Sequence, residues 1–315
     1  EVTAVVSDTY RNRAVTVLGG RGFIGREVVR QLSVAGARVT SVGGGSAEAV
    51  AESAAIHVPG RIAAGLFSAI PELPEIVFHL AGGASVAQST ADPRGDFDRT
   101  VSPTVEVLEY LRLHNPSAHL VYVSSAAVYG DTSARPLGAP RARMPVSHYG
   151  VHKKIAEDLC SFYAEKYRLR ISAIRPFSVY GPGLRKQLLW DALNKADRGR
   201  AEFFGTGAEV RDWVYVSDLA SLLLEVGSGR LAATVDAPLD AGTGIGVTVE
   251  QILTRLLDLY MPGLAPRFLR AANTGNPDIL VAASAQPVVK EILSKVSLDE
   301  GLQRYVAWYR QVNVE

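Results

Sequence analysis

The chain has 315 residues, of which 47% are hydrophobic, and its 33 lysines and arginines almost balance its 32 aspartates and glutamates. This composition predicts a globular protein with a full core and argues against disorder. The near-zero net charge and the lack of a basic stripe argue against a nucleic-acid partner. No apolar run reaches the about 20 residues of a membrane span, and the first residues are not an apolar leader. With a single cysteine, Cys160, and no disulfide within the chain, we expect a soluble, cytoplasmic protein.

Strand-like apolar runs alternate with helix-length amphipathic stretches through the first half of the chain. Strands are predicted at 14–18, 38–42, 76–80, 119–124 and 170–175, and helices at 25–35, 97–114 and 147–167. This alternation predicts the α/β class, with a doubly wound parallel sheet covered by helices on both faces. The second half is less regular, with helices predicted at 217–226, 248–260 and 298–309 and an irregular stretch at 261–277, which indicates a smaller lobe.

A glycine-rich segment, Gly19-Gly-Arg-Gly22-Phe-Ile-Gly25, lies between the first predicted strand and the first predicted helix. Glycines let backbone N–H groups approach a pyrophosphate, and the N-terminus of the helix favours its negative charge. The segment therefore predicts a Rossmann-type dinucleotide site. We expect a dinucleotide-binding domain in residues 1–176, to which a strand near 234–241 returns, and a smaller C-terminal α/β lobe for the substrate, mainly in 177–315.

The end of the second predicted strand bears on the choice of dinucleotide. A Rossmann site usually has an acidic residue there, bonded to the adenosine ribose, but this chain has Gly43 followed by Gly44 and Gly45. Without that carboxylate a 2′-phosphate meets no repulsion, and Arg21 in the glycine loop can pair with it. The sequence thus favours NADP as the cofactor, with NAD as the alternative.

A tyrosine and a lysine, Tyr149 and Lys153, stand four residues apart in a predicted helix, so their side chains share one face. A nearby ammonium stabilises a phenolate, so we expect Lys153 to lower the pKa of Tyr149 and make it an acid/base. Ser125 follows a predicted buried strand at the edge where doubly wound sheets bind ligands. These three residues are the predicted catalytic set.

Five further segments follow the glycine loop in order, and with it they resemble the NAD-dependent epimerase/dehydratase family, the extended short-chain dehydrogenases that act on nucleotide sugars. The resemblance covers about residues 14 to 310. It is carried by His79-Leu-Ala-Gly82, Ser124-Ser-Ala-Ala-Val-Tyr-Gly130, Tyr149 with Lys153, Arg175-Pro-Phe-Ser-Val-Tyr-Gly-Pro182, and Arg211-Asp-Trp-Val-Tyr-Val-Ser-Asp218.

The resemblance implies a role for each matching residue. Tyr149 would be the acid/base, Lys153 its partner and a ligand of the nicotinamide ribose, and Ser125 a ligand of the sugar oxygen. The implied partners are a nucleoside-diphosphate sugar and a second copy of the chain, bound through 97–114 and 147–167; no metal is implied. The expected cofactor ligands are Gly19, Arg21, Gly22, Phe23, Ile24, Gly25, Gly43, Ser46, Leu80, Ala81, Gly82, Lys153, Pro176 and Ser178, and the expected substrate ligands are Ser125, Ser178, Arg185, Lys186, Arg211 and Arg270.

The chain departs from the family pattern in several places. His152 stands where the family often has serine, and we expect it to face solvent or flank the cofactor. Thr100 and Ser178 stand where the family often has asparagine, and their hydroxyls retain the capacity to hydrogen bond. The family's Arg-x-Gly-Asp appears as Asn273-Thr-Gly-Asn276, so its second phosphate-binding arginine is absent, with Arg267 and Arg270 as substitutes.

The residues after Ser125 limit the reactions that the predicted catalytic set can perform. Related dehydratases carry an aspartate and a glutamate there, whereas this chain has Ala126 and Ala127, which cannot transfer protons. Two reactions at C4 of the sugar remain: reduction of a 4-keto-sugar nucleotide by NADPH, slightly favoured by Gly43, and 4-epimerisation with tightly bound NAD. A non-catalytic dinucleotide-binding protein is disfavoured because the catalytic set is retained.

Overall fold

The computed structural model describes residues 9–44, 55–132, 143–269, 276–283 and 286–313. The chain divides into two compact units, each built from several segments. The first comprises Glu1–Val128, His148–Arg175 and Ala220–Asp240, and the second comprises Tyr129–Ser147, Pro176–Leu219 and Ala241–Glu315. Within the described ranges, no helix is long and apolar enough to cross a membrane.

The first unit is built on a seven-stranded sheet with the order β10-β6-β5-β4-β1-β2-β3. Strands β1 to β6 pair in parallel, and the order reverses between β1 and β4, which is where such sheets bind their ligands. β1, β4 and β5 are buried along their whole length, as expected for strands covered on both faces. The strands are β1 (Ala14–Leu18), β2 (Arg38–Gly43), β3 (Ile56–Pro59), β4 (Ile76–His79), β5 (His119–Val123), β6 (Arg170–Pro176) and β10 (Leu239–Ala241).

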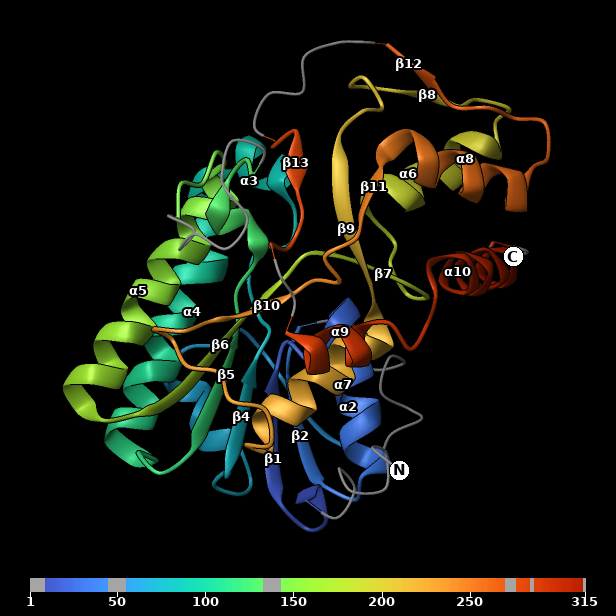
Figure 1. Cartoon of the computed structure of the whole chain (residues 1–315). Coiled ribbons are helices and arrows are strands. Elements are labelled where there is room, and N and C mark those ends of the chain that lie inside the picture. Colours follow the sequence, from blue (N-terminus) through green and yellow to red (C-terminus); the bar gives the residue numbers. More distant parts are fainter. Residues whose placement is uncertain (1–8, 45–54, 133–142, 270–275, 284–285, 314–315) are drawn as a thin grey trace. The chain divides into compact units, whose positions relative to one another are not determined.

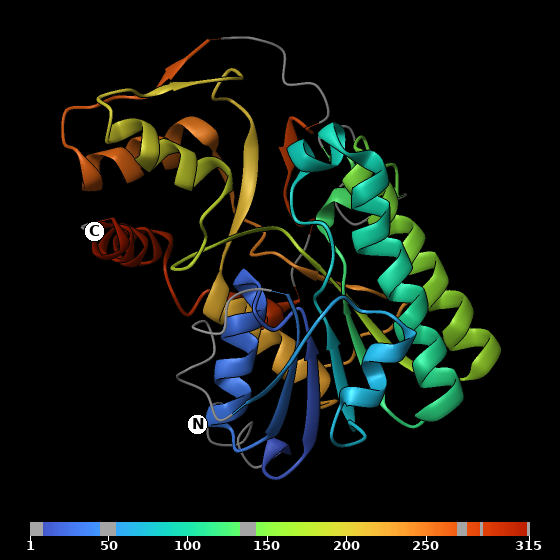
Figure 2. The same cartoon turned by 180° about the vertical axis from the view of Figure 1, so that it is seen from behind.

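Helices cover both faces of this sheet (Figures 1 and 2). On one face lie α4 (Pro93–His114) and α5 (His148–Tyr167), with the short α3 (Val86–Ala91) beside them. On the other face lie α2 (Phe23–Val34) and α7 (Val216–Gly227). The expected doubly wound, Rossmann-type fold is therefore confirmed.

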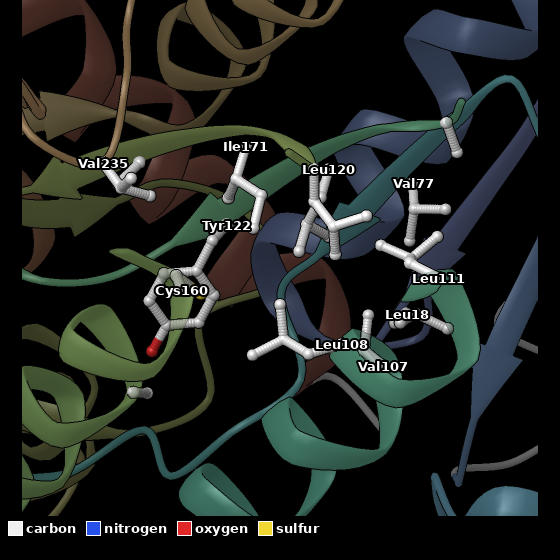
Figure 3. Packing of buried hydrophobic residues seen from close by; sticks show 14 of the residues in the cluster. Leu18, Val77, Val107, Leu108, Leu111, Leu120, Tyr122, Cys160, Ile171 and Val235 are labelled. Carbon is white, nitrogen blue, oxygen red and sulfur yellow. The ribbon is translucent and has the colours of Figure 1, made fainter. Parts of the chain in front are cut away.

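A hydrophobic core lies between the sheet and the α4–α5 layer (Figure 3). Leucines and valines of α4 pack against alternate side chains of neighbouring strands, because successive strand residues point to opposite faces. Cys160 on α5 is fully buried in this cluster, so it serves as a core residue. The residues labelled in Figure 3 are Leu18, Val77, Val107, Leu108, Leu111, Leu120, Tyr122, Cys160, Ile171 and Val235.

The second unit has two small sheets and four helices in its described part. In one sheet the central strand β9 pairs with β11, β13 and β7, and in the other β8 pairs with β12. Tyr305 of α10 donates to the carbonyl of Leu184 at 2.7 Å, and the rings of Trp190 and Tyr309 lie 5.1 Å apart. The elements are β7 (Ser178–Tyr180), α6 (Gln187–Ala196), β8 (Glu202–Phe203), β9 (Val210–Tyr215), β11 (Gly246–Thr248), α8 (Val249–Tyr260), β12 (Arg267–Phe268), β13 (Ile279–Leu280), α9 (Pro287–Leu293) and α10 (Leu298–Val312).

The strongly periodic elements lie close to their predicted positions, and the differences have local causes. The helix predicted from residue 97 begins at Pro93, because proline is favoured in the first turn and Asp92 caps it by accepting from Gly95 N at 2.9 Å. The stretch 261–277, predicted to be irregular, contains β12. A two-residue strand has too few side chains to produce a recognisable alternation.

Candidate active site

The glycine loop after β1 forms a tight turn. Gly19 has a φ of +86°, and a methyl group built on it would lie 2.8 Å from the amide nitrogen of Ala81. A methyl group on Gly25 would lie 2.1 Å from the carbonyl oxygen of Gly19, so the first turn of α2 packs directly on the loop. Both positions therefore require glycine. The loop and the expected ligands Leu80 and Ala81 are neighbours, since Leu80 N donates to Leu18 O at 2.9 Å.

The N-terminus of α2 is suited to a diphosphate. Its N-cap is Gly22, which has no side chain to cap the helix, and the first turn contains no acidic residue. The first N–H groups of the helix are thus left for a ligand, and the helix dipole favours an anion there. Phe23 and Ile24 form this first turn and are partly exposed. These residues fit a nicotinamide dinucleotide.

The end of β2 lies beside the same loop. A methyl group on Gly43 would be 3.6 Å from the Cα of Gly19, and one on Gly20 would be 2.3 Å from the hydroxyl of Ser41. Arg21 is close enough to His57 of β3 to lower the pKa of that imidazole, although burial is the larger cause. A positive charge therefore stands near the end of β2, where the acidic residue of many Rossmann sites is missing. Ser46 lies outside the described residues.

The predicted catalytic side chains meet in the first unit, beyond the ends of β4 and β5. Lys153 is 3% exposed, and its ammonium donates to the carbonyl of Val123 at 2.9 Å and lies 5.4 Å from the ring centre of Tyr122. Burial lowers the pKa of Lys153 from 10.5 to about 8. Ser125 accepts from the amide of Ala127 at 3.2 Å and hydrogen bonds with the phenol of Tyr149. Strand ends and α5 thus bring a phenol, a hydroxyl and a buried ammonium together.

The expectation that Tyr149 has a lowered pKa is wrong for this structure. Burial raises the pKa of the phenol, the nearby charge of Asp96 raises it further, and only the hydrogen bond with Ser125 lowers it. Removal from water destabilises phenolate, and this sets the direction of the shift. Tyr149 is therefore protonated at neutral pH in the protein alone.

A buried pair beside Tyr149 and Lys153 was not recognised from the sequence. Nδ1 of His152 lies 2.6 Å from Oδ2 of Asp96, and the two residues are 8% and 1% exposed. Of the two positions expected for His152, exposure to solvent is wrong, because its ring is buried against Asp96 and Phe97 of α4, whereas a position beside the cofactor stays a prediction. Thr100 accepts from the amide of Gly83 at 2.9 Å, so its hydroxyl does make a hydrogen bond. Asp96 and His152 are 56 residues apart in the sequence and lie on different helices, so no local sequence pattern predicts their contact.

The expected substrate ligands from the later segments lie in the second unit, and Arg270 lies outside the described residues. Ser178 is the first residue of β7 and pairs with Trp213 of β9. Pro176 ends β6 and is buried. The guanidinium of Arg185 lies 5.8 Å from the ring centre of Trp308, and neighbouring Lys186 precedes α6 as its N-cap.

Arg211 lies on β9, partly buried, and donates to the carbonyls of Val210 at 2.8 Å and Asp278 at 3.2 Å. Burial lowers the pKa of its guanidinium. The neighbouring Asp212 is fully buried and accepts from the amides of Thr243 and Gly244 at 2.9 and 2.8 Å. Asp212 therefore holds the turn before β11.

The sequence profile of the NAD dependent epimerase/dehydratase family matches residues 15–228. The chain belongs to this family, and it is an enzyme of the short-chain dehydrogenase type, as the motifs predicted. Within the residues that the structure describes, no group of three or more His, Cys, Asp and Glu side chains is placed to hold a metal.

One relative and two solved structures that resemble the chain are nucleotide-sugar enzymes or bind nucleotide sugars. The chain is 28% identical over 268 residues to a probable UDP-glucuronate 4-epimerase of Rhizobium meliloti, which covers 76% of this chain and 75% of the relative. The crystal structure of the UDP-glucose 4-epimerase of Thermotoga maritima with UDP-glucose has a TM-score of 0.82 and 28% identity, over 96% of this chain and all of that one. The protein MoeE5, in complex with UDP-glucuronic acid and NAD, has a TM-score of 0.83 and 26% identity, over 95% and 99% of the chains.

Proposed function

We propose that this protein is an NAD-dependent 4-epimerase of UDP-linked hexoses or hexuronic acids. The observation that carries the proposal is the hydrogen-bonded phenol of Tyr149 beside Ser125 and the buried Lys153, next to a glycine loop that fits a dinucleotide. Relatives that carry the name 4-epimerase support the choice of reaction. The sequence slightly favoured a ketoreductase, and the comparisons favour the alternative that it left open.

The chain's own residues supply the proton transfer. Tyr149, as phenolate, takes the proton of the C4 hydroxyl, and Ser125 holds that oxygen by a hydrogen bond. The ammonium of Lys153 stabilises the phenolate, which burial otherwise disfavours. NAD, which the glycine loop would hold, would supply the acceptor for the hydride of C4 and the donor that returns it to the opposite face of the keto sugar. Tyr149 then gives its proton back. Ala126 and Ala127 offer no second acid or base, so elimination of a hydroxyl does not compete.

The remaining binding roles are part of the same proposal. In the first unit, the glycine loop with Leu80, Ala81 and Gly82 holds the dinucleotide. In the second unit, which we propose as the substrate lobe, the guanidinium of Arg211 binds the diphosphate through charge-assisted hydrogen bonds. The other proposed ligands there are Pro176 and Ser178 for the cofactor and Ser178, Arg185, Lys186 and Arg270 for the substrate.

A ketoreductase that uses NADPH is the second candidate, and one observation favours it. The end of β2 presents Gly43 instead of a carboxylate, and Arg21 places a positive charge near His57 beside it. A 2′-phosphate meets attraction there, whereas NAD usually relies on an acidic residue.

One experiment separates the two candidates. The nucleotide released from the purified protein by denaturant is identified, and the native protein is incubated with UDP-glucose and with UDP-glucuronic acid without added cofactor. Retained NAD and formation of the 4-epimer, seen by proton NMR, support the proposal. An empty site that binds NADPH far better than NADH, together with no epimer, contradicts it and supports the reductase.

We also propose that the protein forms a homodimer through α4 and α5. These helices carry large apolar side chains that are strongly exposed for a monomer: Leu113 is 56%, Phe162 53% and Val151 40% exposed. Their burial against a second copy would remove apolar surface from water. Analytical ultracentrifugation tests this: Phe162→Glu gives a monomer if the interface is correct, whereas Phe204→Glu, at a phenylalanine of the second unit that is 75% exposed, leaves the dimer intact.

A further inference from the structure

The α4–α5 layer contains a buried ionisable pair to which no role has been given. The carboxylate of Asp96 and the imidazole of His152 are joined over 2.6 Å, and their side chains are 1% and 10% exposed. An ionised carboxylate can only accept hydrogen bonds, so Nδ1 of His152 must carry the proton. A buried charge is costly unless it is paired and hydrogen bonded. His152 therefore holds the carboxylate in one place.

The turn at Gly82 and Gly83 lies between this carboxylate and the ammonium of Lys153. A methyl group built on Gly83 would lie 1.9 Å from Oδ1 of Asp96, and one built on Gly82 would lie 3.2 Å from Nζ of Lys153. Thr100 binds the same turn by accepting from Gly83 N at 2.9 Å. The carboxylate and the ammonium thus stand on two sides of the Gly82–Gly83 turn, directly after β4.

The charge of Asp96 acts on both members of the catalytic pair. It favours the ammonium form of Lys153, opposing the burial that lowers the pKa of that amine to about 8. It also disfavours phenolate, which raises the pKa of Tyr149. The third packed helix, α3, has the sequence VAQSTA and adds no ionisable group. Other ionisable groups on these elements interact with Lys153, Tyr149 or His152: His79 of β4, whose pKa burial lowers to about 3, Tyr122 of β5, and His148, Glu157 and Cys160 of α5.

We propose that Asp96, held by His152, is a positioning residue that keeps the ammonium of Lys153 protonated beside Tyr149 and thereby sets the pH range of the enzyme. The pair touches neither the sugar nor the reacting atoms in this role. The proposal deepens the epimerase function and rests on it for the kinetic readout. Its signature is specific: removal of the negative charge makes both Tyr149 and Lys153 give up their protons at lower pH. The two limbs of the pH profile belong to the coupled Tyr149–Lys153 pair, so both limbs move to lower pH.

The kinetic test compares two single-charge changes on one helix. Asp96→Asn removes the buried charge and keeps an oxygen that can accept from His152. Asp98→Asn makes the same change at an aspartate whose side chain is 40% exposed. We expect both limbs of kcat against pH to shift to lower pH in Asp96→Asn, with KM little changed, and no shift in Asp98→Asn. Should Asp96→Asn not fold, Asp96→Ala removes the same charge and is expected to shift both limbs likewise.

A second variant tests the part of His152. In His152→Asn the amide can replace the Nδ1 donor, so we expect the limbs to stay at their wild-type positions. A loss of kcat at all pH values in Asp96→Asn without a shift, limbs that move in opposite directions, or an equal shift in His152→Asn overturns the proposal. The phenol of Tyr149 is also titrated directly by carbon-13 NMR of labelled tyrosine, assigned with Tyr149→Phe. If no UDP-sugar is epimerised, the proposed function fails. In that case the NMR titration alone tests the inference: a lower pKa of Tyr149 in Asp96→Asn supports it, and an unchanged pKa overturns it.

Discussion

A buried ion pair behind the active site offers a measurable test of how the first unit is held together. Arg175, on β6, binds Glu157, on α5, through two bonds: Nε to Oε1 at 2.8 Å and Nη2 to Oε2 at 2.6 Å. The side chains are 8% and 2% exposed, so water cannot replace either partner. The charge of Glu157 also favours the ammonium of Lys153.

Arg175→Met removes the cation and leaves the carboxylate of Glu157 buried and uncompensated. Breaking such a pair from one side costs about 3–5 kcal/mol of folding free energy. The double variant Arg175→Met with Glu157→Gln removes both charges, and we expect it to recover most of that loss, because the buried charge itself is the main cost. Ion pairs at the surface give a contrast, since Lys154→Met beside Asp158, both more than a third exposed, is expected to cost about 0–1 kcal/mol.

The assay is urea unfolding of the four proteins and the single Glu157→Gln variant, followed by circular dichroism, with the midpoint and slope fitted together. Interaction between the two sites is read from the double-mutant cycle. The reasoning is refuted if Arg175→Met is no less stable than Lys154→Met, or if the double variant is as unstable as the single one.

Three further outcomes are expected. Tyr149→Phe abolishes turnover but leaves dinucleotide affinity nearly intact, as measured by isothermal titration; residual activity near the wild-type level excludes Tyr149 as the acid/base. Burial lowers the pKa of Lys153 to about 8, so the ammonium is present below that pH and is lost as the pH rises through it. We therefore expect kcat to decline above about pH 8. A kcat that stays constant up to pH 10 contradicts this. Asp212→Ala leaves several buried donors without an acceptor and costs about 1–3 kcal/mol for each of them. Thr243→Val removes one of these donors and the acceptor of Ile245 N, and we expect it to lower the thermal midpoint less; equal midpoints refute the assignment.

Much of the first unit follows from local rules. The pattern of apolar residues predicted β1 at 14–18 and placed α2 and α5 close to their observed bounds, because strand and helix periodicities are properties of neighbouring residues. The glycine loop was recognised for the same reason, since Gly19 and Gly25 are required by a turn within a few residues. Elements without a period of their own, such as β3 and β12, form because a neighbouring strand supplies their hydrogen bonds.

Some features of the active site follow from the sequence alone, and others depend on the tertiary structure. The spacing of Tyr149 and Lys153 on one helix, and the position of Ser125 after a strand, were determined by the sequence alone. Only the tertiary structure decided their electrostatics: burial raises the pKa of Tyr149, and Asp96, distant in sequence, meets His152 through the packing of α4 against α5. A sequence pattern records which groups are one helical turn apart. Desolvation and charge depend on every element that excludes water from the site, and these come together only when the chain is folded.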